Sequence, residues 1–170
     1  EALQKLNEEL EQRVAQRTRF FNVLARSREA IVRQRDEKAL FDEICRIIVN
    51  TGGFKLAWIG IVDLATREVR PAASVGTTNY LDGLRIFAAD VPEGKGPTGR
   101  AIVEGHHIIN LDFEQDDNMM PWRERARAHG LRSSSSFPLR NGDTVIGALT
   151  IYSDQPSFFS GDEVSILSSL

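Results

Sequence analysis

The sequence predicts an α+β fold, in which an antiparallel sheet has helices at both chain ends and short helices between its strands. Three observations support this prediction. The first 34 residues contain no glycine or proline and are rich in good helix formers. The run FKLAWIGIV, from Phe54 to Val62, has the apolar, branched and aromatic composition of a central strand. Two further strand-type runs flank Asn141-Gly142, a strong hairpin signal because both residues tolerate positive φ.

The composition is that of one globular domain with an extension: 170 residues, 41% of them apolar and 26% charged. The net charge of −3 and the dispersion of the 21 lysines and arginines argue against nucleic-acid binding. The single cysteine, Cys45, excludes an internal disulfide and a multi-cysteine zinc site and suits a reducing cytoplasm. We expect Cys45 to pack as a small buried hydrophobe without a chemical role.

Neither a membrane span nor a signal peptide is visible, since no run approaches the roughly 18 apolar residues that a span needs. We therefore expect a cytoplasmic segment without membrane contact. The chain begins inside one predicted helix and stops soon after another begins. We expect it to be a piece of a longer protein, whose missing neighbours could include a membrane anchor.

The first 34 residues are predicted to form one long helix with a narrow apolar stripe. Part of the stripe follows a heptad and part recurs every eleven residues, as in Leu3, Leu6, Leu10, Val14, Phe21, Ala25 and Val32. One helix cannot bury such a stripe alone, so we expect a parallel dimeric coiled coil over Leu3 to Val14. After Phe20 the alternative, a helix packed on its own domain, is favoured.

Asp36 is predicted to cap a second amphipathic helix that ends at Thr51 to Gly53. A central strand from Phe54 to Val62 and a partner strand from Glu68 to Val75 follow. The segment Thr77 to Ile86 is predicted to be a short helix.

The stretch GKGPTGRAI, from Gly94 to Ile102, has glycine and proline where a helix begins. Gly96 suits the N-cap, Pro97 suits the first helical position, and Gly105 suits the residue after the end. We expect a two-turn helix from Pro97 to about Glu104. Its N-terminal N–H groups could hold an anionic or carbonyl group, or the helix could merely pack against the sheet. It is not a P-loop, because no Gly-Lys-Ser/Thr ends it.

The rest of the chain predicts a strand at His107 to Leu111, an acidic loop at Asp112 to Met120, and a helix begun by Pro121, Trp122 to His129. The hairpin of Ser133 to Leu139 and Thr144 to Tyr152 follows. Ser160 and Glu163 form a capping box that predicts a terminal helix.

The order FKLAWIGIVD, VRPAASVG, YLDGLRI, GKGPTGRAI, HHIINLDF, GDTVIGALTIYS and FFSGDEVSIL resembles a GAF domain of bacterial sensor proteins. The leading LNEELEQRVAQRT resembles a signalling helix. The resemblance implies a coiled-coil signalling helix at residues 1–34 and a GAF sensor domain at 35–170. It implies a six-stranded antiparallel sheet, with terminal helices that dimerise on one face and a small-molecule pocket on the other. It also implies a C-terminal output domain, a diguanylate cyclase, a cyclic-di-GMP phosphodiesterase or a histidine kinase.

Several family activities do not match these residues. Bilin attachment needs a cysteine near the pocket, and free methionine sulfoxide reductases use several cysteines, whereas Cys45 is alone on an N-terminal helix. Haem-binding relatives use a histidine, and His106, His107 and His129 are available but are more typical of solvated polar residues. The constellation of cyclic-nucleotide-binding members is not found. We therefore expect no cofactor, no metal site and no catalytic residues in this segment.

The candidate ligand-binding residues are polar, aromatic or glycine residues near the expected pocket: Trp58, Arg85, Gly96, Thr98, Gly99, Asp112, Trp122 and Ser134. Each has a structural alternative, since a strand Trp is often core and an arginine after a helix is often exposed. One arginine, a helix N-terminus and aromatic walls suit a small aromatic or carboxylate-bearing metabolite. The sequence thus predicts a regulatory sensor that relays binding through its dimeric helices, with a ligand-free dimerisation spacer as the alternative.

Overall fold

The computed structural model describes residues 1–156, 158 and 159. One antiparallel sheet has the strand order β3-β2-β1-β6-β5-β4. The strands are β1 (Leu56–Val62), β2 (Glu68–Gly76), β3 (Ile86–Phe87), β4 (Ile108–Asn110), β5 (Ser133–Asn141) and β6 (Thr144–Ser153). The predicted α+β fold with a six-stranded antiparallel sheet is confirmed.

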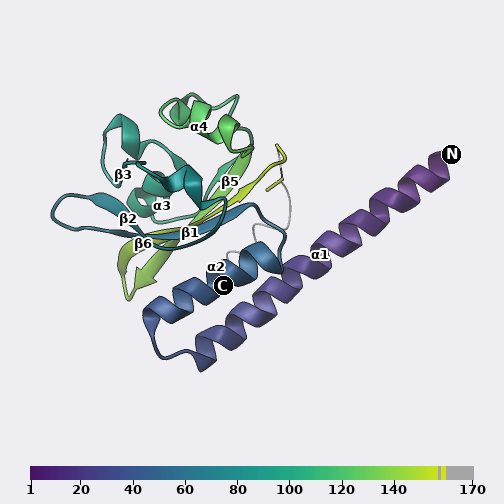
Figure 1. Ribbon diagram of the computed structural model, residues 1–170, viewed down its shortest axis with the longest axis horizontal. Helices are drawn as coiled ribbons and strands as arrows, with labels where there is room; N and C mark the ends of the chain where they lie inside the picture. Colours follow the sequence, from purple (N-terminus) through teal and green to yellow (C-terminus); the bar gives the residue numbers. More distant parts are fainter. Residues whose placement is uncertain (157, 160–170) are drawn as a thin grey trace.

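The two faces of the sheet have different covers (Figure 1). Helices α1 (Ala2–Arg33) and α2 (Glu37–Asn50) lie on one face. On the other face lie short elements: α3 (Pro97–Glu104), α4 (Arg123–Ala128) and the 3₁₀ turns η1 (Thr78–Leu81), η2 (Pro92–Gly94) and η3 (Asp117–Met119). We call these the helix face and the pocket face.

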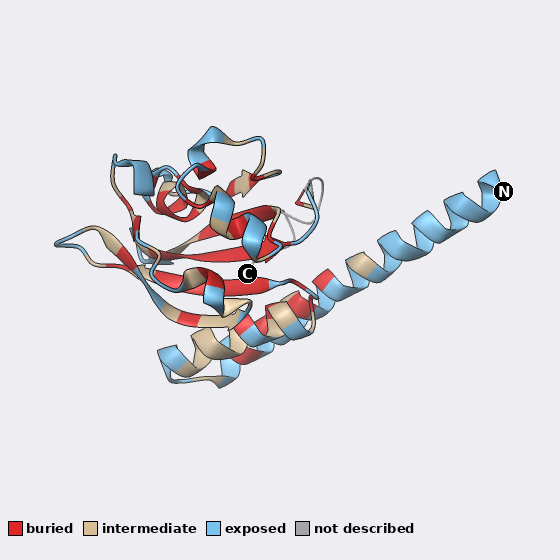
Figure 2. Ribbon diagram, turned by 45° about the horizontal axis from the view of Figure 1, so that its top comes forward, coloured by how far each residue is buried: buried red, intermediate tan, exposed pale blue. Residues whose placement is uncertain are grey.

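Helix α1 divides into a projecting half and a packed half. Its N-terminal half extends beyond the domain and is almost wholly exposed (Figure 2). Leu3 and Val14, with exposed fractions of 81% and 63%, mark the stripe there. Further along, Phe20, Val23 and Ala30 are buried against the domain, as expected for the second half.

The helix face is closed by aliphatic and aromatic side chains. Asp36 caps α2 by accepting a hydrogen bond from the Ala39 N–H at 2.8 Å, as predicted. Below α1 and α2, the Phe54 ring stacks on Phe159 with ring centres 5.8 Å apart. Cys45 is fully buried in the same cluster, as the sequence predicted.

The predicted helix from Thr77 to Ile86 is wrong. Only Thr78–Leu81 forms a 3₁₀ turn, because Asp82 already has an extended backbone and Gly83, with a positive φ of 72°, then turns the chain. Ile86 instead pairs with Val69 in the short edge strand β3. Because β3 has an extended backbone, the chain leaves the helical conformation before Ile86.

Two smaller boundaries also differ from the prediction. The hairpin turn lies at Gly142 and Asp143, because Asn141 still pairs with Thr144 and, of these residues, only Gly142 has positive φ. Helix α4 begins after Trp122. The predicted terminal helix after Ser160 lies outside the described residues. None of the helices in the described part of the chain is long and apolar enough to cross a membrane.

Candidate functional site

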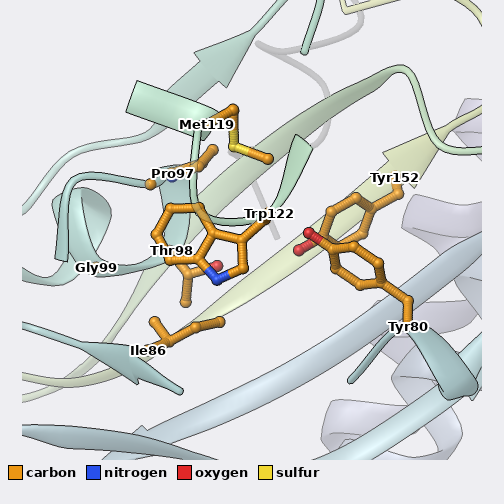
Figure 3. A pocket seen from close by; sticks show the side chains of 9 residues that line it. Tyr80, Ile86, Pro97, Thr98, Gly99, Met119, Trp122 and Tyr152 are labelled. Carbon is orange, nitrogen blue, oxygen red and sulfur yellow. The ribbon is translucent and has the colours of Figure 1, made fainter. Parts of the chain in front are cut away.

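A small cavity lies on the pocket face, between the N-terminus of α3, the turns η1 and η3, and strand β6 (Figure 3). Its volume is about 10 Å³, which is room for about one water molecule. Nine residues line it: Tyr80, Ile86, Gly96, Pro97, Thr98, Gly99, Met119, Trp122 and Tyr152. No charged side chain is among these nine.

Two buried tyrosines form the polar end of the cavity. Their rings meet edge to face, with centres 5.4 Å apart, and in Figure 3 their hydroxyl groups point the same way. Trp58 lies beneath them and donates from Nε1 to the Tyr152 hydroxyl at 3.2 Å. Burial raises the pKa of Tyr152 to about 12, although hydrogen bonds from Trp58, Thr98 and Tyr80 offset part of the rise. Burial also raises the pKa of Tyr80, so both phenols are neutral at physiological pH.

Thr98 anchors the start of α3 to the sheet. Its hydroxyl lies 2.7 Å from the Thr150 hydroxyl, which is itself 2.7 Å from that of Ser136. Hydrogen-bonded hydroxyls satisfy buried polar groups and fix the helix over strands β5 and β6. The N-terminus of α3 is therefore held at the cavity by side-chain bonds.

The glycines of GKGPTGRAI are needed for close approach. A Cβ on Gly96 would lie 2.6 Å from the Trp122 ring, and a Cβ on Gly99 would overlap the Phe87 carbonyl oxygen. Gly96 has a φ of −73°, which any residue can adopt. The predicted helix from Pro97 to Glu104 is confirmed, with Gly105 in the left-handed conformation at its end.

Residues 112–132, here called the lid, carry Trp122 over the cavity and are held by arginines. Arg123 donates to the Phe113 and Asp116 carbonyl oxygens at 3.1 and 2.7 Å. Arg127 makes two bonds to Glu114, and these bonds lower the pKa of that carboxyl group. Such bidentate pairs fix the geometry of a loop that has little regular structure.

A further arginine joins the lid to the opposite rim of the cavity. Arg125 of α4 donates to the carbonyl oxygens of Tyr80 on η1 and of Asp82, the residue after η1. These bonds tie α4 of the lid to the backbone of the segment that carries Tyr80.

Of the predicted site residues, the structure brings together Gly96, Thr98, Gly99 and Trp122 in the lining. Trp58 is buried behind it. Ser134 is fully buried beside Tyr152 on the sheet, and no described residue is a hydrogen-bond partner of its hydroxyl.

Two predicted site residues lie away from the cavity lining. The Arg85 side chain is 67% exposed and is 3.6 Å from Glu68, over the Phe87 ring. Arg85 follows Gly83 and does not project from a helical face, so its side chain does not reach the cavity lining. Asp112 pairs with Arg132 at 3.2 Å and supports the base of the lid.

Sequence reasoning missed Tyr80 and Tyr152. Thr150 is the cross-strand partner of Trp58, and Tyr152 lies two residues further along β6, so the period-two alternation of a strand predicts that Tyr152 lies on the same face. Tyr80 reaches it from a turn with no such regularity, so only the structure reveals the pair.

Other reactive groups lie outside this cavity. His106 and His129 each place Nδ1 near a backbone oxygen, at 3.0 and 2.9 Å. Within the described ranges, no group of three His, Cys, Asp or Glu side chains could hold a metal ion. Cys45 lies on the helix face, and burial raises its thiol pKa to about 12.

Comparison with solved structures finds the same architecture. The free methionine-R-sulfoxide reductase of Neisseria meningitidis has a TM-score of 0.72 at 20% identity, over 88% of this chain and 82% of that one. The A. aeolicus nlh2 GAF domain in an inactive state has a TM-score of 0.69 at 16% identity, over 91% of both chains. The GAF domain of a Coxiella burnetii phosphoenolpyruvate-protein phosphotransferase has a TM-score of 0.73 at 13% identity, over 89% and 88%.

At such identities these likenesses concern the fold alone. Comparison with curated proteins finds no match. A family model described as GAF domain matches residues 34–170. This match covers most of the chain and agrees with the six-stranded sheet and the cavity between its short helices. The chain therefore belongs to the GAF domain family, a family of regulatory and sensor domains.

Proposed function

We propose that this chain is the sensor module of a bacterial signal-transduction protein, which binds a small molecule in the cavity on the pocket face. The observation that carries the proposal is the polar end of the cavity, Tyr80 and Tyr152, which lies buried under a lid held by arginine bonds. Buried hydroxyls cost free energy unless they are paired, and those of Tyr80 and Tyr152 lie at the edge of a cavity, where a bound ligand can pair with them in addition to their protein partners. A ligand that enters must move the lid, and this gives binding a structural consequence.

The relay to the rest of the protein is proposed to use α1. Phe20, Val23 and Ala30 face the domain, whereas an exposed stripe runs along the same helix. The stripe recurs in steps of seven and four residues: Leu3, Leu10, Val14, Phe21, Ala25 and Val32. An eleven-residue repeat corresponds to about 3.7 residues per turn, which is close to the value of a straight α-helix. The stripe therefore stays on one side of α1, where a second copy can pair in parallel.

We propose residues 1–34 as this signalling helix and residues 35–170 as the sensor domain. The output would be a C-terminal diguanylate cyclase or cyclic-di-GMP phosphodiesterase, with a histidine kinase as the alternative. Leu10→Glu should give a monomer in sedimentation velocity at tens of micromolar, while Asn22→Glu, which adds the same charge off the stripe, should remain dimeric. A monomeric wild type would contradict the dimeric relay.

A second candidate is methionine sulfoxide reduction, because a free methionine-R-sulfoxide reductase is similar in fold. Thiol-based reduction of a sulfoxide needs a reactive thiolate and a second thiol to form a disulfide. This sequence has one cysteine, and Cys45 is fully buried on the opposite face from the cavity. We therefore favour the sensor.

The deciding experiment is native mass spectrometry of the protein as purified, followed by denaturation to release any retained small molecule. A retained compound whose removal is followed by rebinding in calorimetry supports the sensor. The control is Tyr152→Phe, which keeps the ring but removes one hydroxyl from the polar end of the cavity and should weaken rebinding. A chain that neither retains nor binds any metabolite would favour the ligand-free dimerisation spacer.

A further inference from the structure

The Trp122 side chain fills most of the space under the lid. Its exposed fraction is 4%, and its ring lies against the bare backbone of Gly96. Figure 3 shows the indole between Pro97 and Thr98 on one side and the tyrosine hydroxyls on the other. Only about 10 Å³ remains beside it. The cavity is small because a side chain from the lid occupies it.

The two tryptophans of the chain differ in how they are held. Trp58 is fixed in β1 and donates its N–H to Tyr152. Among the described residues, the Trp122 indole nitrogen has no hydrogen-bond partner. Trp122 lies directly before α4, outside regular structure. Withdrawal of Trp122 would break packing contacts but no side-chain hydrogen bond.

The walls define what could replace the indole. Ile86, Pro97 and Met119 supply apolar contacts, and Tyr152 supplies a phenol at one end. Since Trp58, Thr98 and Tyr80 are all donors to the Tyr152 oxygen, the phenol's own proton remains available to an acceptor in the cavity. No charged side chain lines the space, and an isolated charge is costly to bury.

The arginine that could have attracted a carboxylate lies elsewhere. Arg85 is paired with Glu68 at 3.6 Å, over the Phe87 ring. The sequence left open a small aromatic or a carboxylate-bearing ligand. Because Arg85 pairs with Glu68, the cavity has no cation to bind a carboxylate, and a neutral aromatic ligand is favoured.

We propose that the Trp122 indole acts as a plug in the ligand's place, and that the ligand is a neutral, planar aromatic molecule of about indole size with one hydrogen-bond acceptor directed at Tyr152. This deepens the proposed function and rests on it. Binding would expel the indole from beside Gly96 and shift the lid, which is the structural change that a sensor has to relay.

The test uses Trp122→Ala to remove the plug and two probes of matched shape. Indanone is a fused bicycle with one carbonyl oxygen, and indane is the same skeleton without it. Calorimetry should show that indanone binds Trp122→Ala at least about tenfold more tightly than indane does, the order expected for one buried hydrogen bond. Adding Tyr152→Phe should abolish this preference. Equal affinities for the two probes would overturn the acceptor assignment.

Met119→Ala is the matched control, because it enlarges the same cavity but leaves the indole in place. Indanone should bind Trp122→Ala at least about tenfold more tightly than Met119→Ala. Equal binding would show that Trp122 is a wall and not a plug.

A second variant keeps the test valid if Trp122→Ala does not fold. Gly96→Ala places a Cβ 2.6 Å from the indole, closer than real contacts allow, and should push the ring out. With fluorotryptophan incorporated, the Trp122 fluorine resonance should move to a solvent-exposed position in this variant, and in wild type with saturating indanone. The Trp58 resonance should change little. An unmoved Trp122 resonance in both samples would overturn the plug.

The mass-spectrometric test separates this inference from the proposed function. An anionic or aliphatic compound retained by the wild type would preserve the sensor and overturn the ligand class. Retention of a neutral aromatic compound, with the Trp122 resonance shifted, would support both.

Discussion

The two faces of one sheet are built from alternating residues of the same strands, yet they differ in chemistry. On β6, Leu149 and Ile151 enter the apolar cluster beneath α1 and α2. The intervening Thr150 and Tyr152 carry hydroxyls into the pocket face. The helix face buries its ring pairs without polar partners, and its buried Ser135 hydroxyl has none among the described residues, whereas the pocket face joins phenols, hydroxyls and the Trp58 N–H by hydrogen bonds.

This difference in chemistry indicates which face of the sheet can change its conformation. An apolar cluster is held by packing, and each displaced side chain leaves a cavity that nothing repairs. A network of hydroxyls can exchange partners when a ligand supplies donors or acceptors. We therefore expect the helix face to support the relay as a rigid body and the pocket face to rearrange.

The largest expected effect is on the helix face, where two neighbouring phenylalanines of α1 form a matched pair. Phe20 is buried with its ring 5.7 Å from that of Phe54, and Phe21 is 53% exposed. Phe20→Ala should lower the free energy of unfolding by about 3–5 kcal/mol, whereas Phe21→Ala should change it by less than about 0.5 kcal/mol at monomeric concentrations. Urea unfolding measures both.

Similar losses for the two variants would mean that the outer side of α1 is already packed, and the exposed stripe would no longer be available to a partner.

Next in size is Gly99→Val on the pocket face. The new side chain would overlap the Phe87 carbonyl oxygen and press on that of Gly94, and neither backbone atom can turn away. We expect a loss of about 3 kcal/mol, the upper part of the range for overpacking. Glu104→Val, in the same helix but half exposed, is the control and should cost less than about 0.5 kcal/mol. Thermal unfolding of both variants is the measurement.

A small loss for Gly99→Val would show that α3 can retreat from β3. The structure would then allow the helix itself, and not only the lid, to move on binding.

Alkaline pH separates the two faces, since each buries a group whose pKa is raised. Burial raises the pKa of Cys45 from 9.0 to about 12 and that of Tyr152 from 10.0 to about 12. Above its ordinary pKa each group stays protonated only when folded, so the folded state binds more protons and stability falls as pH rises. The expected slope is about 1.4 kcal/mol per pH unit for each group.

Cys45→Ala should therefore delay the onset of this fall from about pH 9 to about pH 10, because the tyrosines then titrate first. Tyr152→Phe should keep the early onset and lessen the slope above about pH 10, where Cys45 and Tyr80 supply the remainder. Urea unfolding across this range measures both effects. An unchanged onset in Cys45→Ala would mean that the thiol is accessible to solvent.

The local signals in the sequence predicted the elements well. Asp36, Pro97 and Gly105 act within one turn of the chain, and the structure places each where the pattern did. The apolar run of β1 likewise required burial on both faces. Such signals depend on residues close in sequence, which is why they can be interpreted without the fold.

The site depended on contacts between distant residues. The contact between Gly96 and Trp122, and that between Trp58 and Tyr152, join segments far apart in the chain. Arg85 was misplaced because Gly83 turns the chain before it, and only the pairing of β3 decides where its side chain lies. Composition identified candidates on the pocket face but not their arrangement.

The smallest expected effect distinguishes the faces at two adjacent serines of β5. Ser134 pairs across the sheet with Tyr152 and Ser135 with Ile151, so one lies on the pocket face and the other on the helix face. Both are fully buried, and neither hydroxyl has a partner among the described residues. Replacing either by alanine removes an unsatisfied group, so both variants should unfold within about 1 kcal/mol of wild type.

The two serine variants also test how far the binding site extends along β5. Ser134 lies beside Tyr152 but outside the cavity lining, so Ser134→Ala and Ser135→Ala should each leave indanone affinity, measured in the Trp122→Ala background, within about twofold of the parent. A tenfold loss confined to Ser134→Ala would mean that the site extends past Tyr152 along β5. It would then include Asn110, the cross-strand partner of Ser134, whose buried Nδ2 also has no partner in the described chain. The ligand would in that case be longer than an indole, because it would have to reach from the Trp122 position across Tyr152 to strand β4.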